Sequence, residues 1–111
     1  MKRSHRLLKD ADFQVVLAKK IYVKSPEFSI YGYKKPNGET RIGISVSKKI
    51  GIAVVRNKIR RQIRMMLSKQ TTLQDPIDYI VIVRDQFLKK TFLENQISLL
   101  SYVSLLRRKL I

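Results

Sequence analysis

Four arginines and one asparagine between positions 56 and 64 are the side chains with the most distinctive chemistry in this 111-residue sequence. They are Arg56, Asn57, Arg60, Arg61 and Arg64. In a helix Arg56, Arg60 and Arg64 stack above one another, and like charges at that spacing repel and destabilise an isolated helix. Guanidinium groups bind phosphate oxygens through paired hydrogen bonds and also stack on bases. The row therefore indicates an anionic ligand that compensates its charge.

Three lysines reinforce the row, because Lys48 and Lys49 precede it and Lys58 lies within it. No acidic residue occurs between Ser47 and Arg64. A solvated helix face is the alternative, and it suits isolated surface arginines better than this uncompensated set. The whole chain has 24 basic and 8 acidic residues, a formal net charge of +16. Such a charge attracts polyanions, with nucleic acid as the first candidate and an anionic membrane as the second.

Catalytic and metal-binding side chains are scarce. The absence of cysteine excludes disulfides, thiolate zinc sites and cysteine nucleophiles. His5 is the only histidine, and the sequence reveals no partner for it in general acid–base catalysis. Asp10 and Asp12 have the spacing of a metal motif, but carboxylates there are better explained as the start of a helix. An autonomous nuclease is therefore disfavoured.

A second group of side chains combines aromatic and apolar residues, namely Phe13, Leu17, Tyr31 and Tyr33. Phe13 and Leu17 share a predicted helix face, and core packing explains each of them taken singly. Tyr31 and Tyr33 point away from the core-facing side of a predicted strand. If the first helix leaves a gap over the sheet, these side chains line a groove for an unpaired nucleic-acid strand, where stacking contributes ~1–3 kcal/mol per base.

The surrounding pattern predicts one α+β domain over residues 1–111. Helices are expected over about 10–19, with Asp10 as N-cap, over 53–69 and over 92–106. Strands are expected over 21–23, 28–33, 40–46 and 79–83. A turn at Pro36-Asn37-Gly38 favours a hairpin between the second and third strands. Together these elements predict a sheet covered by helices.

Apolar stripes predict which faces enter the core. In the basic helix the stripe lies beside the arginine row and consists of Val55, Ile59, Ile63, Met66 and Leu67. In the last helix it consists of Leu93, Ile97, Leu100 and Val103. The strand at 79–83 is apolar throughout, which is typical of a strand covered on both faces.

No segment approaches the roughly 18 continuous apolar residues of a membrane span. The basic start of the chain is not followed by the apolar core of a signal peptide. We therefore expect a cytoplasmic protein without a membrane partner.

The segment S-V-S-K-K-I-G-I-A-V-V-R-N-K-I-R-R-Q-I-R, from Ser45 to Arg64, resembles the signature of bacterial ribonuclease P protein subunits, whose central element is the RNR motif. The likeness continues in R-L-L-K-D-A-D-F-Q-V-V-L at 6–17, F-S-I-Y at 28–31 and D-Y-I-V-I-V-R at 78–84. The sequence departs from the family at Ile52, where asparagine is common, and at Leu17, where an aromatic residue is common. In the family, both positions bear on contacts with the 5′ leader of the substrate, precursor tRNA.

The resemblance implies a two-layer α/β sandwich in the order α-β-β-(β)-α-β-α, as in the second domain of ribosomal protein S5. Its βαβ crossover would be left-handed, against the usual rule. The resemblance also implies that a catalytic RNA, not the protein, carries out the Mg²⁺-dependent hydrolysis that removes the 5′ leader from precursor tRNA. Mg²⁺ would be bound mainly by the RNA, no organic cofactor is expected, and one protein monomer would join each catalytic RNA.

Carried over by position, the family's RNA-binding residues are Lys48, Lys49, Arg56, Asn57, Lys58, Arg60, Arg61 and Arg64. Its leader-binding cleft corresponds to Phe13, Leu17, Tyr31 and Ser45. No catalytic or metal-binding residue is expected in the protein itself. The main alternative is a ribosomal-type protein that only scaffolds RNA. If six or more phosphates are contacted, RNA affinity should fall ~10³-fold or more over a few-fold rise in salt.

Overall fold

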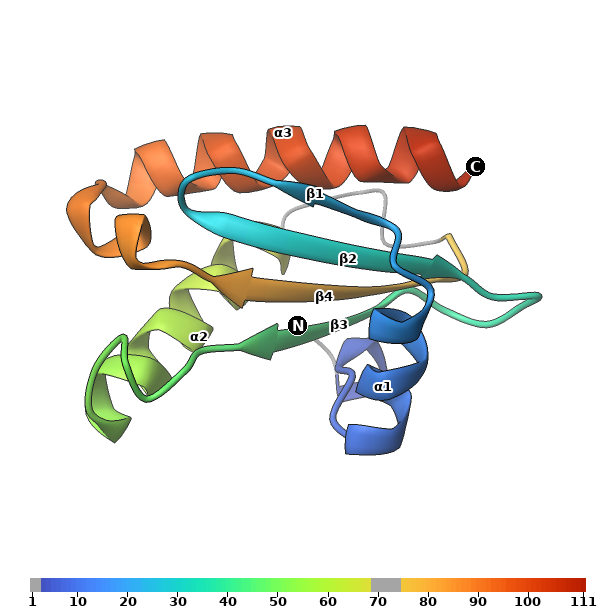
Figure 1. The fold of residues 1–111 in the computed structure, drawn as a ribbon, viewed down its shortest axis with the longest axis horizontal. Coiled ribbons are helices and arrows are strands. Elements are labelled where there is room, and N and C mark those ends of the chain that lie inside the picture. Colours follow the sequence, from blue (N-terminus) through green and yellow to red (C-terminus); the bar gives the residue numbers. More distant parts are fainter. Residues whose placement is uncertain (1–2, 69–74) are drawn as a thin grey trace.

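The computed structural model describes residues 3–68 and 75–111. Four strands form one sheet in the order β1-β2-β4-β3: β1 (Tyr22–Lys24), β2 (Phe28–Lys34), β3 (Arg41–Ser45) and β4 (Ile77–Val83). The helices are α1 (Asp10–Ala18), α2 (Ala53–Ser68) and α3 (Phe92–Leu110), with short 3₁₀ helices η1 (Arg3–His5) and η2 (Asp85–Lys89) (Figure 1). Helices α2 and α3 pack on one face of the sheet and α1 on the other. The α+β class is confirmed.

Strand β4 occupies the centre of the sheet, where it pairs antiparallel with β2 and parallel with β3. The predicted hairpin between the second and third strands is therefore wrong, and β2 pairs with β1 instead. The physical reason is that β4 is apolar on both faces, so a central position removes more of its surface from water than an edge would. The chain still turns at 36–38, where Gly38 has a φ of 105°. The left hand of the β3-α2-β4 crossover stays a prediction.

The larger core lies between the sheet and the helices α2 and α3. Its fully buried side chains include Phe28 and Ile30 of β2, Val81 of β4, Ile63 of α2 and Leu99 of α3. The stripe predicted for α2 is buried at four of its five positions. The exception is its first residue, which lies in the opening turn of the helix at 36% exposure and borders a groove instead of the core.

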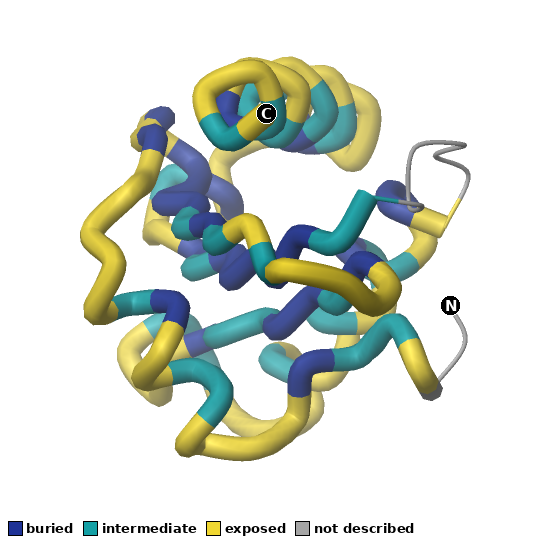
Figure 2. Tube along the Cα trace, turned by 90° about the vertical axis from the view of Figure 1, so that its right-hand side faces the viewer, coloured by how far each residue is buried: buried dark blue, intermediate teal, exposed yellow. Residues whose placement is uncertain are grey.

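Two positions of the stripe predicted for the last helix are wrong. Leu93 and Ile97 are 62% and 59% exposed, whereas Leu106 is buried and Leu110 packs against the core. Figure 2 shows the outward side of α3 exposed and its sheet-facing side buried. Apolar residues occur on both sides of α3. The side that packs on the sheet is the one whose side chains lie directly over Gly32. A Cβ atom at Gly32 would lie 2.6 Å from Cδ1 of Leu110.

The helix ends differ slightly from the predicted ones. Asp10 is the first residue of α1 and not its N-cap, since Lys9 takes the cap position and makes no side-chain cap hydrogen bond. Asp10 and Asp12 still favour the helix from its first turn, where the helix dipole is positive. Helix α3 extends to Leu110, four residues beyond its predicted end, and the predicted last residue of α2, Lys69, lies outside the described residues.

On the other face of the sheet, α1 is held by packing and by an ion network. Val16 is fully buried against β4, and Phe13 closes over Gly43, where a Cβ atom would clash with the ring. The carboxylate of Asp78, 3% exposed, lies 2.7 Å from Nη2 of Arg41 and 2.9 Å from Nζ of Lys35. The hydrogen bond with Asp78 is the main cause that raises the pKa of Arg41. This network fixes the edge of the sheet beneath α1.

Tyr79, on the face of β4 toward α3, is 4% exposed, and burial raises the pKa of its phenol to about 12. Because this value exceeds the unfolded pKa of about 10, folding favours the neutral phenol. Its contribution is present below pH 10 and is lost as the pH rises toward 12, by up to about 3 kcal/mol. Urea unfolding between pH 8 and 12 should show a smaller loss of stability for Tyr79→Phe. Lysine titration is common to both proteins, so identical pH profiles would contradict this assignment.

Candidate nucleic-acid interface

The arginines of α2 lie on the flank that borders its buried stripe. Arg56, Arg60 and Arg64 are half-buried and Arg61 is exposed, so the aliphatic stems cover the core while the guanidinium groups reach the surface. Nε of Arg56 donates to the carbonyl oxygen of Gly51 at 3.1 Å. These arginines, with Asn57 and Arg6, are called the arginine face below.

Asn57 contributes to the arginine face by orienting a neighbour. Nη1 of Arg60 donates to Oδ1 of Asn57 at 2.9 Å, one helical turn away. This bond engages the amide oxygen and leaves the amide NH₂ group as a donor. The predicted row is therefore assembled on one side of α2, and its members are available to an external acceptor.

Arg6 completes the arginine face, although it was not among the RNA-binding residues predicted from the sequence. The segment before α1 lies along the free edge of β3, where the backbone N–H of Leu7 donates to the carbonyl oxygen of Ile42 at 3.0 Å. Leu7 is 2% exposed and packs beneath α1. Arg6 borders α2, beside Arg61 and Arg64. Only the pairing with β3, which no local pattern encodes, reveals this placement.

Arg6, Arg61 and Arg64 line a pocket of about 370 Å³ together with Met65 and Ser68. Burial first, and then the charges of Arg6 and Arg60, lower the pKa of Arg64. The buried Nε of Arg6 donates no hydrogen bond within the part of the chain that the structure describes. A phosphate group would relieve the repulsion and accept hydrogen bonds from several of these donors at once.

Four acidic side chains are engaged elsewhere in the fold. Asp12 and Asp78 bind Arg41, Asp75 binds Arg107, and Glu94 completes the capping box at the start of α3. Within residues 3–68 and 75–111, no carboxylate forms an ion pair with an arginine of α2. The charge of the arginine face is therefore not neutralised by these described residues.

The three predicted lysines do not lie together. Lys48 and Lys49 are exposed in the turn before α2, where the backbone N–H of Ile50 donates to the carbonyl oxygen of Ser47 at 3.0 Å. Lys58 lies on the opposite flank of α2 from the arginine face and lines a groove toward η2 and α3. The structure thus separates Lys58 from the arginine row with which it was predicted.

The residues predicted for the leader cleft share the α1 side of the sheet. Phe13, Leu17 and Tyr31 are half-buried around Val16 and Ile80. Ser45 is also half-buried, and strand alternation places it on the side of β3 that faces Phe13. The structure therefore brings all four onto one surface.

Tyr22 extends this surface and was not identified from the sequence. It lies directly opposite Tyr31 in the β1–β2 pair, with ring centroids 5.1 Å apart, and is 43% exposed. Nζ of Lys24 lies 5.4 Å from the Tyr22 ring, and Nζ of Lys19 lies 4.9 Å from the Tyr33 ring. Tyr22 could be placed beside Tyr31 only from the pairing of β1 with β2, which the sequence of a three-residue strand does not reveal. We call Phe13, Leu17, Tyr22, Tyr31, Tyr33 and Ser45 the aromatic face.

Metal-binding side chains do not gather in the described ranges, 3–68 and 75–111, where no three His, Cys, Asp or Glu residues are placed to hold an ion. None of the described helices combines the length and the apolar character needed to cross a membrane.

Comparison with known proteins gives one consistent family. The profile of the family described as Ribonuclease P matches residues 1–107. The ribonuclease P protein component of Streptococcus agalactiae is 47% identical over 85 residues, which cover 76% of this chain and 77% of the relative. That of Mesoplasma florum is 39% identical over 98 residues, covering 86% and 89%. The solved Staphylococcus aureus RNase P protein superposes with a TM-score of 0.84 at 36% identity, covering 93% of this chain and 95% of that one.

The pocket between Arg6, Arg61 and Arg64 predicts specific stabilisation by phosphate. At a phosphate concentration tenfold above Kd, ligand linkage should stabilise the fold by about 1.4 kcal/mol over chloride at matched ionic strength. Arg6→Gln should lose most of this gain, because it removes one donor from the pocket. Lys34→Gln removes the same charge outside the pocket and should retain it. Thermal melts check this, and equal gains for both variants would exclude a localised site.

Proposed function

The chain belongs to the bacterial ribonuclease P protein family and is a subunit of ribonuclease P, an endoribonuclease of tRNA 5′ maturation, and on this premise we propose that its two surfaces bind different parts of the reacting RNAs. The arginine face binds the catalytic RNA, and the aromatic face binds the single-stranded leader of precursor tRNA. The observation that carries the proposal is the arginine face itself, because its charge is not neutralised by the described carboxylates.

The contribution of the arginine face is electrostatic. Two RNAs that must approach each other repel through their phosphates, and a cationic surface between them lowers that repulsion and releases counterions. Arg60, held by Asn57, presents a planar donor group in a fixed direction, which suits a phosphate oxygen better than a freely rotating ammonium. Arg6, Arg61 and Arg64 add a pocket of about 370 Å³ whose guanidinium donors can bind a phosphate group.

The aromatic face suits an unpaired strand. Tyr22 and Tyr31 form a pair on which a base can stack, and Lys24 lies beside it to meet a backbone phosphate. Stacking does not depend on which base is bound, because every base has an aromatic face. Such a contact suits leaders of different sequence. Leu17, where relatives of the family commonly have an aromatic residue, supplies apolar contact only.

The RNA supplies the catalytic centre in this proposal. Mg²⁺ is held mainly by RNA phosphates, and the protein needs no organic cofactor. One monomer joins each catalytic RNA, since the charge of +16 opposes close association between copies of the free protein. The cytoplasm, where precursor tRNA is processed in bacteria, is the proposed location.

Cleavage of precursor tRNA by the catalytic RNA of the same organism at low Mg²⁺ tests the division of labour. The protein should accelerate cleavage, and Arg60→Ala/Arg64→Ala should weaken RNA binding roughly 10²- to 10⁴-fold, because each of the two lost charge-assisted hydrogen bonds contributes about 1.5–3 kcal/mol. Lys34→Ala/Lys109→Ala removes two charges outside the arginine face and serves as the matched control.

The same assay separates the alternatives. Cleavage by the protein without the RNA would indicate an autonomous nuclease, and RNA binding without any acceleration would indicate a scaffold of the ribosomal type. If the double arginine variant and its lysine control lose RNA affinity equally, the arginine face is not a specific RNA-binding site.

Tyr22→Ala should weaken binding of precursor tRNA by about 1–3 kcal/mol, the contribution of one stacked base. Tyr22→Phe keeps the ring and should bind almost as the parent does. Binding of mature tRNA, which has no leader, should not change in either variant. Titrations of the holoenzyme with both tRNAs measure these differences, and an equal effect on mature tRNA would place Tyr22 outside the leader contact.

A further inference from the structure

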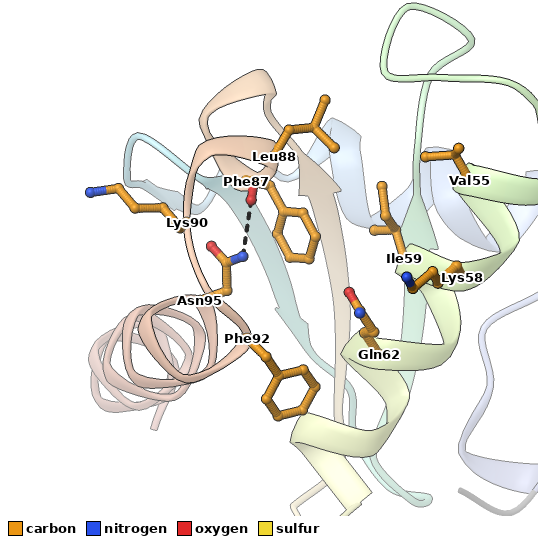
Figure 3. A pocket seen from close by; sticks show the side chains of 9 residues that line it. All are labelled: Val55, Lys58, Ile59, Gln62, Phe87, Leu88, Lys90, Phe92 and Asn95. Carbon is orange, nitrogen blue, oxygen red and sulfur yellow. Dashed lines mark hydrogen bonds between the residues drawn. The ribbon is translucent and has the colours of Figure 1, made fainter.

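A groove of about 300 Å³ lies between α2 and the corner where η2 joins α3 (Figure 3). Buried Ile59 and Phe87 line its interior, and the more exposed Val55 and Phe92 border it. The ring of Phe92 is an aromatic surface at 40% exposure. The groove occupies the flank of α2 opposite the arginine face and shares no lining residue with the phosphate pocket.

The polar groups of the groove are cationic or amide. Lys58 of α2 and Lys90, which precedes α3, line the groove on its two sides, and Figure 3 shows the Lys90 side chain extending outward from it. No carboxylate is among its described lining residues. Gln62 and Asn95 supply amides. Nδ2 of Asn95 donates to the carbonyl oxygen of Phe87 at 3.0 Å, while its buried Oδ1 accepts no hydrogen bond from the described residues.

We propose that this groove binds an unstacked nucleobase of the RNA partner, with Phe92 stacking on the base and Lys58 and Lys90 meeting the flanking phosphates. The inference rests on the proposed function, since it assigns a second contact to an RNA already held by α2. The 16 residues of α2 span about 24 Å. An RNA bound at the arginine face therefore has its backbone within a few nucleotides of the groove.

Charge and chemistry favour this occupant over others. A second copy of the protein would bring two surfaces of the same strong positive charge together. A purely apolar helix would leave both ammonium groups and the amides without partners. A nucleobase with its backbone combines a flat apolar ring, polar edges and negative charge, and so matches the aromatic ring, the amides and the lysines of the groove.

Affinity for the catalytic RNA, measured with the full chain at several salt concentrations, tests the groove. Phe92→Ala should weaken binding about five- to twentyfold without changing the salt dependence, because stacking releases no counterions. Leu93→Ala is the matched control, since it removes a more exposed apolar side chain from the same helical turn but outside the groove. Lys58→Gln should lower the log–log salt slope by about one contact.

Two further variants separate stacking from a structural role of Phe92. Phe92→Leu keeps an apolar side chain without an aromatic face and should bind as weakly as Phe92→Ala, whereas Phe92→Tyr should restore the affinity. If Phe92→Ala and Leu93→Ala bind the catalytic RNA with equal affinity, the groove does not bind a nucleobase. The proposed function still stands in that case, provided that Arg60→Ala/Arg64→Ala weakens binding. If the unmodified protein bound the catalytic RNA without salt dependence, the proposed function itself would fail.

Discussion

Positive charge along α2 that no carboxylate of residues 3–68 and 75–111 neutralises is the constraint on which the rest of the structure depends. Repulsion between like charges one turn apart costs about 0.2–0.5 kcal/mol per pair. Burial of an isoleucine or methionine side chain contributes about 1.5–3 kcal/mol, and Ile59, Ile63 and Met66 are all buried. Packing therefore exceeds repulsion, and the helix forms although none of its arginines has a carboxylate partner among the described residues. The molecule keeps a binding surface because its core supplies the stability that this surface lacks.

The few carboxylates reinforce the same division. Asp78 and Asp12 hold Arg41 beneath α1, and Asp75 holds Arg107 of α3, so negative charge secures the sheet and the helices that cover it. Glycines at 32 and 43 admit Leu110 and the ring of Phe13 closely to the sheet. One face of the sheet is thereby closed by α2 and α3, while α1 leaves aromatic side chains partly accessible on the other.

Local patterns predicted the local features. The period of α2, its buried stripe and the row from Arg56 to Arg64 follow from spacing alone, because helix geometry is set within a few residues. Sheet order does not, since β4 lies between β2 and β3 although α2 separates it from β3 in the sequence. The two sides of α3 are similarly apolar, and the choice between them depends on Gly32, some seventy residues earlier. Arg6 and Tyr22 were missed for the same reason, because each acquires its neighbours through strand pairing.

The segment before α1 has a consequence for communication between the surfaces. Arg6 lines the pocket that it shares with Arg61 and Arg64, whereas its neighbour Leu7 is buried under α1, the helix that carries Phe13. One peptide unit thus joins a residue of the arginine face to a residue packed beneath the aromatic face. In the proposed function, the catalytic RNA therefore contacts one residue of this backbone segment and the leader contacts side chains packed over the next, and any coupling between the two contacts is reciprocal by linkage.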